Sequence, residues 1–454
     1  MPDTLVNYDG SIRTSPQQLV YPETVADIQR VVRDRSRYPS PVRAMGSHHS
    51  LTPCATSDGT ILKMSKMTRI LQIDRARQTI TAEAGLQYID AADALRKEGL
   101  QFVLNIEIGN LTLGSAACCH TKDALDGAEF GQVGSYVTAV KWVNPAGELE
   151  EATEETNPEL LRRVRTSYGL CGVIYEVTLR VKPIEAAQLT YLPRPVDELT
   201  DDEVSDIIAR SEGLVCWTLG RTSVFQTKTR ITDPGHLARL QGEGRRLLWN
   251  NIAAFWARAI DQYLDGPFEQ LVQEQAIRLT RLIFFSLQMT GGIHILNPDK
   301  TIDYRHTDEP ARYAFTFWAF PRDEWLATLR AYLDFADAHH RRYGFRCNMP
   351  LGAYSIRKDD HALLSYSGEG DMFSLDPIHA PSDQAAWDRF LREFNEFATT
   401  RRGIPLLNQS PFVTREHCER AYGARWTEFS RWVREVDPDG RMVNPFFREL
   451  LSAP

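Results

Sequence analysis

The sequence predicts an α+β protein with two domains and a compact C-terminal segment. Up to Pro183, short apolar strand patterns alternate with amphipathic helical patterns, as in a mixed α/β domain. Beyond Pro183 the pattern changes to an acidic cluster over residues 197–206 and longer helical segments. The chain has 454 residues, which is enough for two full hydrophobic cores. We therefore expect domains over residues 1–183 and 184–400, followed by a segment over 401–454.

The first domain is expected to begin with a helix and a buried strand that lead into a glycine. Thr24 is positioned to cap this helix, whose apolar face repeats at helical spacing from residue 25 to residue 32. Residues 42–45 form the apolar strand pattern, which ends at Gly46. The later predicted elements are strands over 79–84, 137–143 and 175–181 and an amphipathic helix over 88–97.

The second domain and the C-terminal segment are expected to be richer in helix. A helix-rich block spans residues 236–288. A further helix over 324–340 lies between apolar, strand-like runs over 313–320 and 373–375. The C-terminal segment contains two predicted helices, over 415–422 and 426–436. Because no flexible linker separates the domains, we expect them to pack against each other.

Composition and charge argue against several classes of protein. The net charge of −8 disfavours a nucleic-acid-binding protein, which normally carries a basic face. The most apolar stretch, over residues 282–287, is too short to span a bilayer, so no membrane span is expected. The N-terminus lacks the basic and apolar regions of a signal peptide, which predicts a cytoplasmic protein. The seven cysteines show no C-x-x-C spacing, so neither a disulfide framework nor a metal site is expected.

The strand over residues 42–45 runs into a glycine loop that carries two adjacent histidines, His48 and His49. Because glycine adopts backbone angles that other residues avoid, such a loop can bring backbone N–H groups close to a phosphate. The sequence has no G-x-G-x-x-G at a strand–helix junction and no G-x-x-x-x-G-K-[ST], the other common phosphate-binding loops. Pro53, shortly after the loop, also disfavours the helix that a Rossmann turn requires.

Residues 43–50 resemble the pyrophosphate-binding loop of the vanillyl-alcohol oxidase / p-cresol methylhydroxylase (PCMH) superfamily of flavoproteins. The family's G-x-x-H-S pattern fits Gly46 to Ser50. Three later segments are similar to family segments in the same order, namely 56–62, 110–115 and 169–174. Residues 437–447 are similar to the end of the aldonolactone-oxidase and alditol-oxidase branch. The resemblance implies a PCMH-type FAD-binding domain of two α/β subdomains, a second α+β substrate or cap domain, and a C-terminal segment that returns to the FAD domain.

The same resemblance implies an FAD attached through a single histidyl bond. In many members the histidine of the G-x-x-H-S pattern is joined to the flavin, and His49 holds that position here. Some relatives add a cysteinyl bond, but this chain has Asn110 at that position, so one bond is expected. Noncovalent FAD, with His49 only as a hydrogen-bonding residue, remains the alternative. The expected cofactor-binding residues are Ala44, Met45, Gly46, Ser47, His48, His49, Ser50, Gly114, Ser115, Cys118, Cys119, His120, Thr121, Gly172, Val173, Ile174, Asn408 and Asn444.

Several of these positions have a second interpretation. Cys118 and Cys119 also fit small buried residues near the cofactor, and Asn444 also fits a turn-capping residue. Relatives often carry a Thr-His pair in the second loop, and both His120 and Lys122 are candidates for the place of that histidine. The sequence leaves both interpretations open at each of these positions.

The expected substrate region departs from that of the sugar-oxidising relatives. They carry a pattern like E-x-E-Y-A-V-P, and the matching residues 315–321 have phenylalanines at both acidic positions. Because buried hydroxyls without partners are costly, this change predicts an apolar, aromatic or terpenoid alcohol rather than a polyol. A W-G-K motif of several relatives is replaced by amides, which orient a hydroxyl but are not bases. The expected substrate residues are Phe315, Phe317, Trp318, Asn408 and Gln409, with the aromatics as interdomain core residues in the alternative interpretation.

The predicted reaction is the oxidation of a small-molecule alcohol by hydride transfer to FAD, with molecular oxygen as the expected acceptor. It requires a group that accepts the hydroxyl proton. The candidates are His294, Tyr354, His361 and Glu107, with Arg357 as an electrostatic partner only, and no spacing singles one out. A flavin dehydrogenase, an oxidative-cyclisation enzyme of secondary metabolism and a non-catalytic ligand-binding protein are the alternatives.

Overall fold

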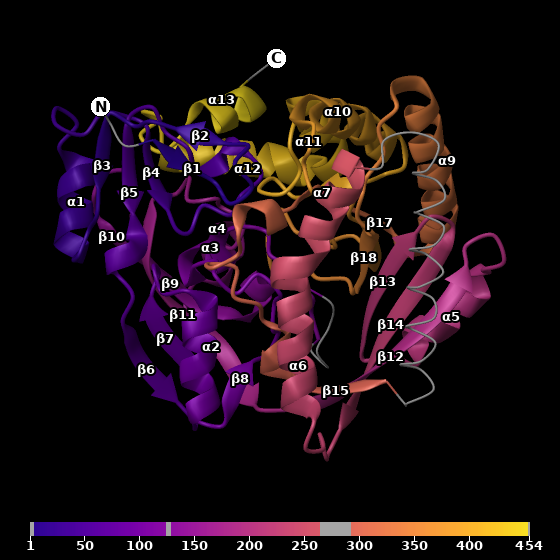
Figure 1. Ribbon diagram of the computed structural model, residues 1–454. Helices are drawn as coiled ribbons and strands as arrows, with labels where there is room; N and C mark the ends of the chain where they lie inside the picture. The colour runs from indigo at the N-terminus through magenta and orange to yellow at the C-terminus, as the bar shows by residue number, and fades with distance from the viewer. Residues whose placement is uncertain (1–3, 124–128, 264–291, 453–454) are drawn as a thin grey trace.

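Figure 1 shows the computed structural model, which describes residues 4–123, 129–263 and 292–452. The N-terminal part of the chain and a large antiparallel sheet lie side by side, and the C-terminal helices lie across one end of both. Segments from all three parts line the cavities described below.

A small parallel sheet carries the glycine loop. Its order is β3(Gln18–Val20)-β5(Thr60–Lys63)-β4(Val42–Met45). The helix α1(Val25–Arg33) packs against this sheet through its apolar face. At the start of this helix, Thr24 and Asp27 form a capping box, in which the side chain of each residue accepts a hydrogen bond from the backbone N–H of the other. The predicted helix and strand are confirmed, and β4 leads directly into Gly46.

An antiparallel sheet completes the N-terminal part. Its order is β10(Leu149–Thr153)-β9(Val137–Val143)-β11(Val173–Pro183)-β7(Thr79–Glu83)-β6(Ile70–Asp74), with β8(Leu100–Phe102) paired to β11. The remaining elements here are α2(Tyr88–Lys97), α3(Leu113–Cys118), α4(Pro158–Val164) and the pair β1(Leu5–Val6) and β2(Arg13–Thr14). The strands predicted over 79–84, 137–143 and 175–181 and the helix predicted over 88–97 are confirmed.

The large antiparallel sheet follows in the chain. Its order is β15(Ile293–Leu296)-β12(Ala186–Pro195)-β14(Thr222–Ile231)-β13(Gly213–Leu219)-β18(Leu351–Ile356)-β19(Met372–Leu375)-β17(Trp318–Pro321)-β21(Ile404–Pro405). The helices of this part are α5(Asp201–Ala209), α6(Ala238–Leu247), α7(Ala253–Tyr263) and α9(Trp325–Tyr343). The ring of Trp325 stacks on Phe373 of β19 at 4.1 Å and holds α9 on the sheet.

Two predicted features of this part differ from the structure. The run over 313–320 forms two short strands, because β16(Ala314–Phe315) pairs with β20(Ile378–His379) whereas β17 pairs with β19 and β21. The helix-rich block over 236–288 is described up to Tyr263, and its remainder, which includes the apolar stretch over 282–287, lies outside the described residues. Within the described ranges, no helix is long and apolar enough to cross a membrane. The domain boundaries after residues 183 and 400 stay a prediction.

The C-terminal helices lie at the top of Figure 1 and lead the chain back to the N-terminal part. They are α10(Gln384–Thr400), α11(Arg415–Tyr422), α12(Ala424–Val436) and α13(Pro445–Leu451). Between α12 and α13, the buried Arg441 donates to the carbonyl oxygens of Val31 and Tyr38, both at 2.7 Å. The backbone N–H of Val42 donates to the carbonyl oxygen of Arg441 at 2.7 Å, so the C-terminal segment is fastened to the start of β4.

Candidate active site

A cavity of about 1030 Å³ lies beside the glycine loop. Its walls include the loop from Gly46 to Ser50, the start of α3 at Gly114, the turn before β11 at Gly172, and Asn408 from the C-terminal segment. These segments are widely separated in the sequence. The fold therefore brings the loops that the sequence singled out around one space.

Two glycines allow backbone segments to approach closely at this cavity. A Cβ atom on Gly46 would lie 2.3 Å from the Oγ1 atom of Thr112. A Cβ atom on Gly172 would lie 2.1 Å from the carbonyl oxygen of Val143, and Gly172 also has a φ of +138°. Because other residues rarely adopt this backbone angle, the turn at Gly172 depends on glycine.

The cavity wall contains a buried cation and unpaired polar atoms. Arg43 donates to the carbonyl oxygens of Cys54 and Tyr168 at 2.8 and 2.5 Å, and within the described residues no carboxylate pairs with it. The side-chain oxygens of Asn408 and Gln409 are buried and have no hydrogen-bond partner in the part of the chain that the structure describes. Since buried polar groups are normally hydrogen-bonded, these atoms indicate room for a polar ligand.

A second cavity of about 690 Å³ adjoins the first. Four residues line both cavities, namely Ile108, Leu111, Thr121 and Gln409. The aromatic residues of the second cavity are Trp217, Tyr304, Tyr313, Phe315 and Tyr354. Its charged residues are Glu107, Lys122, Asp123 and Asp376. The second cavity thus combines aromatic walls with buried charges and shares a boundary with the first.

Glu107 is held as an anion at the second cavity. Its carboxylate pairs with Arg245 of α6, and it accepts a hydrogen bond from the Tyr354 hydroxyl at 3.2 Å. Burial opposes ionisation, but Arg245 and Lys300 outweigh it and lower the pKa of Glu107. Burial raises the pKa of Tyr354 well above 10, so this phenol stays protonated and acts as a donor.

Lys122 and Asp376 form a second buried pair on the same cavity. The Nζ atom of Lys122 lies 2.6 Å from Oδ2 of Asp376, and both side chains are at least nine-tenths buried. The same Nζ lies 3.4 Å from the ring centroid of Tyr354, within cation–π range. The lysine is therefore fixed between a carboxylate and an aromatic face.

Comparisons with known proteins agree with this geometry. Residues 16–153 match the FAD binding domain family. Over 98% of the chain, the sequence is 22% identical to L-gulonolactone oxidase of Scyliorhinus torazame and 27% identical to L-gulono-1,4-lactone dehydrogenase of Mycobacterium tuberculosis, covering 97% and 98% of those proteins. The chain therefore contains an FAD binding domain and is similar to flavoproteins of the PCMH type. Its fold matches that of cholesterol oxidase from B. sterolicum, with a TM-score of 0.77 and 15% identity over the whole chain and 97% of that protein.

The first cavity fits the FAD of this superfamily. Phosphate groups require positive charge and hydrogen-bond donors, and Arg43 supplies a buried positive charge at the wall. The glycine loop exposes backbone close to the same space. Asn408 and Gln409 offer unpaired amide oxygens for the polar edges of a flavin. The residues of the first cavity therefore fit an FAD, and this space is called the FAD cavity below.

His49 lines the FAD cavity and lies near a residue of the second cavity. Its ring stacks on Tyr8 at 4.7 Å and lies edge-on to Tyr304, a residue of the second cavity, at 6.4 Å. Burial lowers the pKa of His49 to about 4, so its imidazole is neutral at pH 7 and keeps a nucleophilic nitrogen. The neighbouring His48 has a φ of +60°, and it also lines the FAD cavity.

Most of the predicted cofactor-binding residues of this flavoprotein line the FAD cavity. These are Ala44, Gly46, Ser47, His48, His49, Ser50, Gly114, Ser115, Cys118, Cys119, Thr121, Gly172, Ile174 and Asn408. Met45, Val173 and Asn444 are absent from its walls. Met45 and Val173 are almost completely buried, and the side chains of neither residue reach the cavity. Asn444 caps α13 and donates to the carbonyl oxygens of Pro53 and Thr56, so its turn-capping interpretation fits the structure.

Neither His120 nor Lys122, the two candidates for the place of the family's histidine, lines the FAD cavity. His120 is buried in the core, where its ring nitrogens contact the Tyr168 hydroxyl at 2.6 Å and the carbonyl oxygen of Leu364 at 2.5 Å. The prediction that His120 contacts the cofactor is therefore corrected. Lys122 lines the second cavity instead.

Three of the five predicted substrate residues lie at the cavities. Phe315 lines the second cavity, Asn408 lines the FAD cavity, and Gln409 lines both. Phe317 and Trp318 lie in the core instead: Phe317 packs on Tyr366, and the indole N–H of Trp318 donates to Asn395. Of the two phenylalanines on which the prediction of an apolar substrate rested, only Phe315 lines a cavity and still supports it.

Glu107 and Tyr354 are the two predicted proton acceptors that the fold brings to the second cavity. His294 lies on the edge strand β15, opposite Gln188 of β12, and lines neither cavity. Arg357 follows β18 and is exposed. Both of these predicted roles are corrected, because neither side chain reaches the region where the cavities meet.

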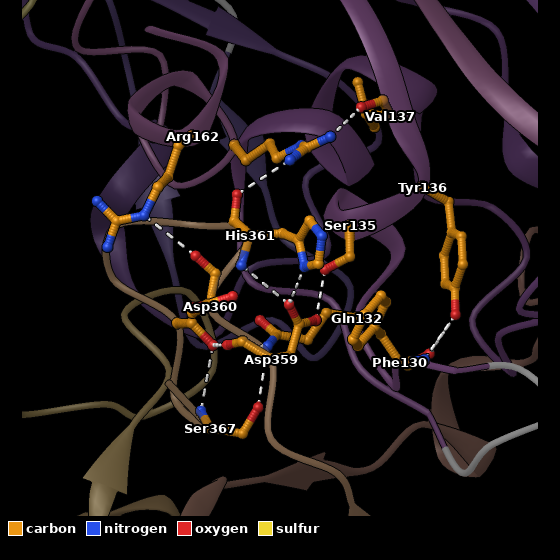
Figure 2. Close-up of polar contacts among 12 residues, drawn as sticks. Phe130, Gln132, Ser135, Tyr136, Val137, Arg162, Asp359, Asp360, His361 and Ser367 are labelled. Atoms are coloured by element: carbon orange, nitrogen blue, oxygen red, sulfur yellow. Dashed lines mark hydrogen bonds and ion pairs between the residues drawn. The ribbon is translucent and has the colours of Figure 1, made fainter. Parts of the chain in front are cut away.

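His361 belongs to a polar cluster that joins the N-terminal part to the segment after β18, as Figure 2 shows. Its Nδ1 atom lies 3.0 Å from Oδ1 of Asp359, and the Ser135 hydroxyl donates to the other oxygen of that carboxylate. Asp359 raises the pKa of His361. Since serine and histidine both contact the aspartate and not each other, the cluster is no catalytic triad, and the catalytic role of His361 is corrected.

Sequence reasoning missed Asp123 and Asp376 as residues of the second cavity, and Arg245 as the ion-pair partner of Glu107. Lys122 was named only as a cofactor contact. Except for the neighbours Lys122 and Asp123, these residues are more than one hundred positions from one another in the sequence. No motif or spacing relates them, so only the fold reveals that they share one site.

Proposed function

We propose that this FAD-dependent oxidoreductase oxidises the CH–OH group of a small substrate in the second cavity, with sugar 1,4-lactones as the first candidates. The supporting observation is the wall shared by the two cavities at Leu111, Thr121 and Gln409, because a substrate in the second cavity would lie next to a flavin in the first. The lactone class is supported by relatives named L-gulonolactone oxidase and L-gulono-1,4-lactone dehydrogenase, which match over 98% of the chain.

The charges of the second cavity suit a hydroxylated substrate better than the sequence pattern alone suggested. Glu107 accepts hydrogen bonds, Lys122 donates them, and the amide of Gln409 orients a hydroxyl. Trp217 and Tyr313 offer apolar faces for the C–H side of a sugar ring. The flavin supplies the hydride acceptor when bound.

An apolar or aromatic alcohol is the second candidate, because Phe315 occupies the cavity where sugar-oxidising relatives carry an acidic residue. Anaerobic mixing of the purified yellow protein with L-gulono-1,4-lactone, other aldono-1,4-lactones, alditols and aromatic alcohols separates the two. We expect loss of the visible flavin absorbance with lactones. Bleaching by aromatic alcohols alone would refute the lactone proposal, and no bleaching by any substrate would refute alcohol oxidation.

We also propose oxygen as the electron acceptor, as in relatives named oxidases. Air should reoxidise the bleached protein as fast as an added dye acceptor does. A dye-dependent reaction with slow reoxidation in air would identify a dehydrogenase, like the relative of that name.

His49 is the proposed attachment point of the flavin. In His49→Ala, acid precipitation should release all flavin into the supernatant, because the neutral ring nitrogen that forms the bond is gone. The wild-type pellet should stay yellow. The matched control is His48→Ala, whose pellet should also stay yellow because His49 is intact. Flavin released completely from the wild-type protein would show noncovalent binding.

A further inference from the structure

Oxidation of an alcohol needs a group that accepts the hydroxyl proton, and the two predicted candidates in the second cavity are poorly suited. Arg245 holds Glu107 as a weakly basic anion, whereas burial keeps Tyr354 protonated. A proton acceptor works best when its pKa lies near the working pH. Neither of these groups meets that condition.

Asp376 is a rigidly placed carboxylate on the same cavity. Its backbone N–H donates to the Gly352 carbonyl oxygen at 2.7 Å, and its own carbonyl oxygen accepts from the Gly352 N–H at 3.0 Å. These two backbone hydrogen bonds fix Asp376 directly after β19, next to the central strands of the large sheet. Only 3% of the side chain is exposed.

The two carboxylate oxygens of Asp376 have different surroundings. Oδ2 accepts from Lys122 at 2.6 Å, whereas Oδ1 is buried without a hydrogen-bond partner among the described residues. A buried carboxylate oxygen is rarely left unpaired, because its desolvation is costly. Since Asp376 lines the second cavity, the hydroxyl of a substrate bound there is positioned to donate the missing hydrogen bond to Oδ1.

The charges that face Asp376 set its basicity. Burial raises its pKa to about 6, and Glu107 adds to the rise, whereas Lys122 and the Ser374 hydroxyl work in the opposite direction. The carboxyl is therefore ionised above about pH 6 and protonated below it. A base with this pKa is ready to accept a proton at neutral pH.

We propose that Asp376 is the catalytic base that accepts the substrate hydroxyl proton, with Lys122 as the positioning residue that orients its carboxylate. The inference rests on the proposed function. Oδ1 of Asp376 accepts the O–H proton, and a bound oxidised flavin would take the hydride, with both electrons, from the C–H bond that breaks. The C–O bond becomes a carbonyl, and the carboxyl later returns its proton to solvent.

The first test follows anaerobic flavin reduction against pH. In the wild type, the rate should rise with pH through about 6 and then stay level, because the ionised carboxyl is the reactive form. Asp376→Asn should reduce the rate about 100-fold or more and remove this pH dependence. A variant that keeps the wild-type rate and pH profile overturns the proposal. Asp359→Asn, which removes a buried carboxylate from the cluster in Figure 2, should keep the midpoint near pH 6.

The second test needs no substrate. The infrared difference spectrum between wild type and Asp376→Asn should show a carboxyl band that titrates near pH 6. In Lys122→Met, loss of the cation should raise this midpoint by about one pH unit. A midpoint near pH 4 would overturn the proposal even if alcohols reduce the flavin. Conversely, a titration near pH 6 in a protein that no alcohol reduces would count against the proposed function alone.

Asp376→Asn leaves Lys122 as a buried, unpaired cation, which threatens folding. The double variant Asp376→Asn/Lys122→Met removes both charges and avoids that problem. It should bind flavin as the wild type does and still lack the pH-dependent rate. If the double variant reduces its flavin at the wild-type rate, Asp376 is not the base.

Discussion

Gly172→Ala should lose both its flavin and a large part of its stability. The new Cβ atom would lie 2.1 Å from the carbonyl oxygen of Val143, which belongs to β9, and the φ of +138° disfavours alanine as well. Val143 is paired with Val173 at the start of β11, so relief of the clash must separate these strands at the wall of the FAD cavity. We expect a loss of roughly 3–5 kcal/mol in the free energy of unfolding.

Denaturant unfolding followed by tryptophan fluorescence, together with the ratio of flavin to protein, measures this effect. Gly99→Ala is the matched control, since Gly99 has a φ of +72° but no atom within 4 Å of a new Cβ. That variant should lose only about 1 kcal/mol, from backbone strain alone, and keep its flavin. Equal losses in the two variants would contradict a steric origin at Gly172.

Arg43→Met should also lose flavin and stability, because one guanidinium joins several segments at the FAD cavity. It donates to the carbonyl oxygens of Cys54, Tyr168 and Met442, all of which would be left without that donor. Leaving buried acceptors unpaired costs about 1–3 kcal/mol for each group, so we expect a total near 3–5 kcal/mol. The lost positive charge should weaken phosphate binding in addition.

Arg441→Met separates these two effects. Arg441 also donates to several buried carbonyl oxygens, among them those of Val31, Val32 and Tyr38, but it does not line the FAD cavity. We expect a comparable loss of stability with normal flavin content in the folded protein. The measurements are denaturant midpoints and flavin-to-protein ratios. If Arg43→Met retains flavin as Arg441→Met does, the charge of Arg43 has no role in cofactor binding.

The FAD domain was predictable because its signals are local. The capped helix α1, the strand β4 and the loop after Gly46 are each set by residues that are neighbours in sequence. Gly46 and Gly172 mark places where the backbone must approach another segment, and glycine at such a place can be recognised without the fold. The choice of His49 rather than His48 as the candidate attachment residue followed from its position directly before Ser50 in the same loop.

The substrate residues were not predictable in the same way. The match of residues 315–321 to the E-x-E-Y-A-V-P pattern predicted that Phe315 and Phe317 both line the substrate region, yet the run breaks into β16 and β17, which pair with different strands. Phe315 therefore reaches the cavity while Phe317 packs in the core. His361 and Glu107 looked alike as isolated ionisable residues, and only their neighbours, Asp359 and Arg245, distinguish them.

The sequence by itself determined the FAD-binding fold, the glycine loop at Gly46 and the candidate histidine at position 49. These depend on short-range backbone requirements that a few consecutive residues satisfy. The tertiary structure alone decided which ionisable groups meet in the second cavity. Glu107 and Lys122 lie far from Asp376 in the sequence, and the pKa values of all three depend on burial and on charges that only folding brings within a few ångströms.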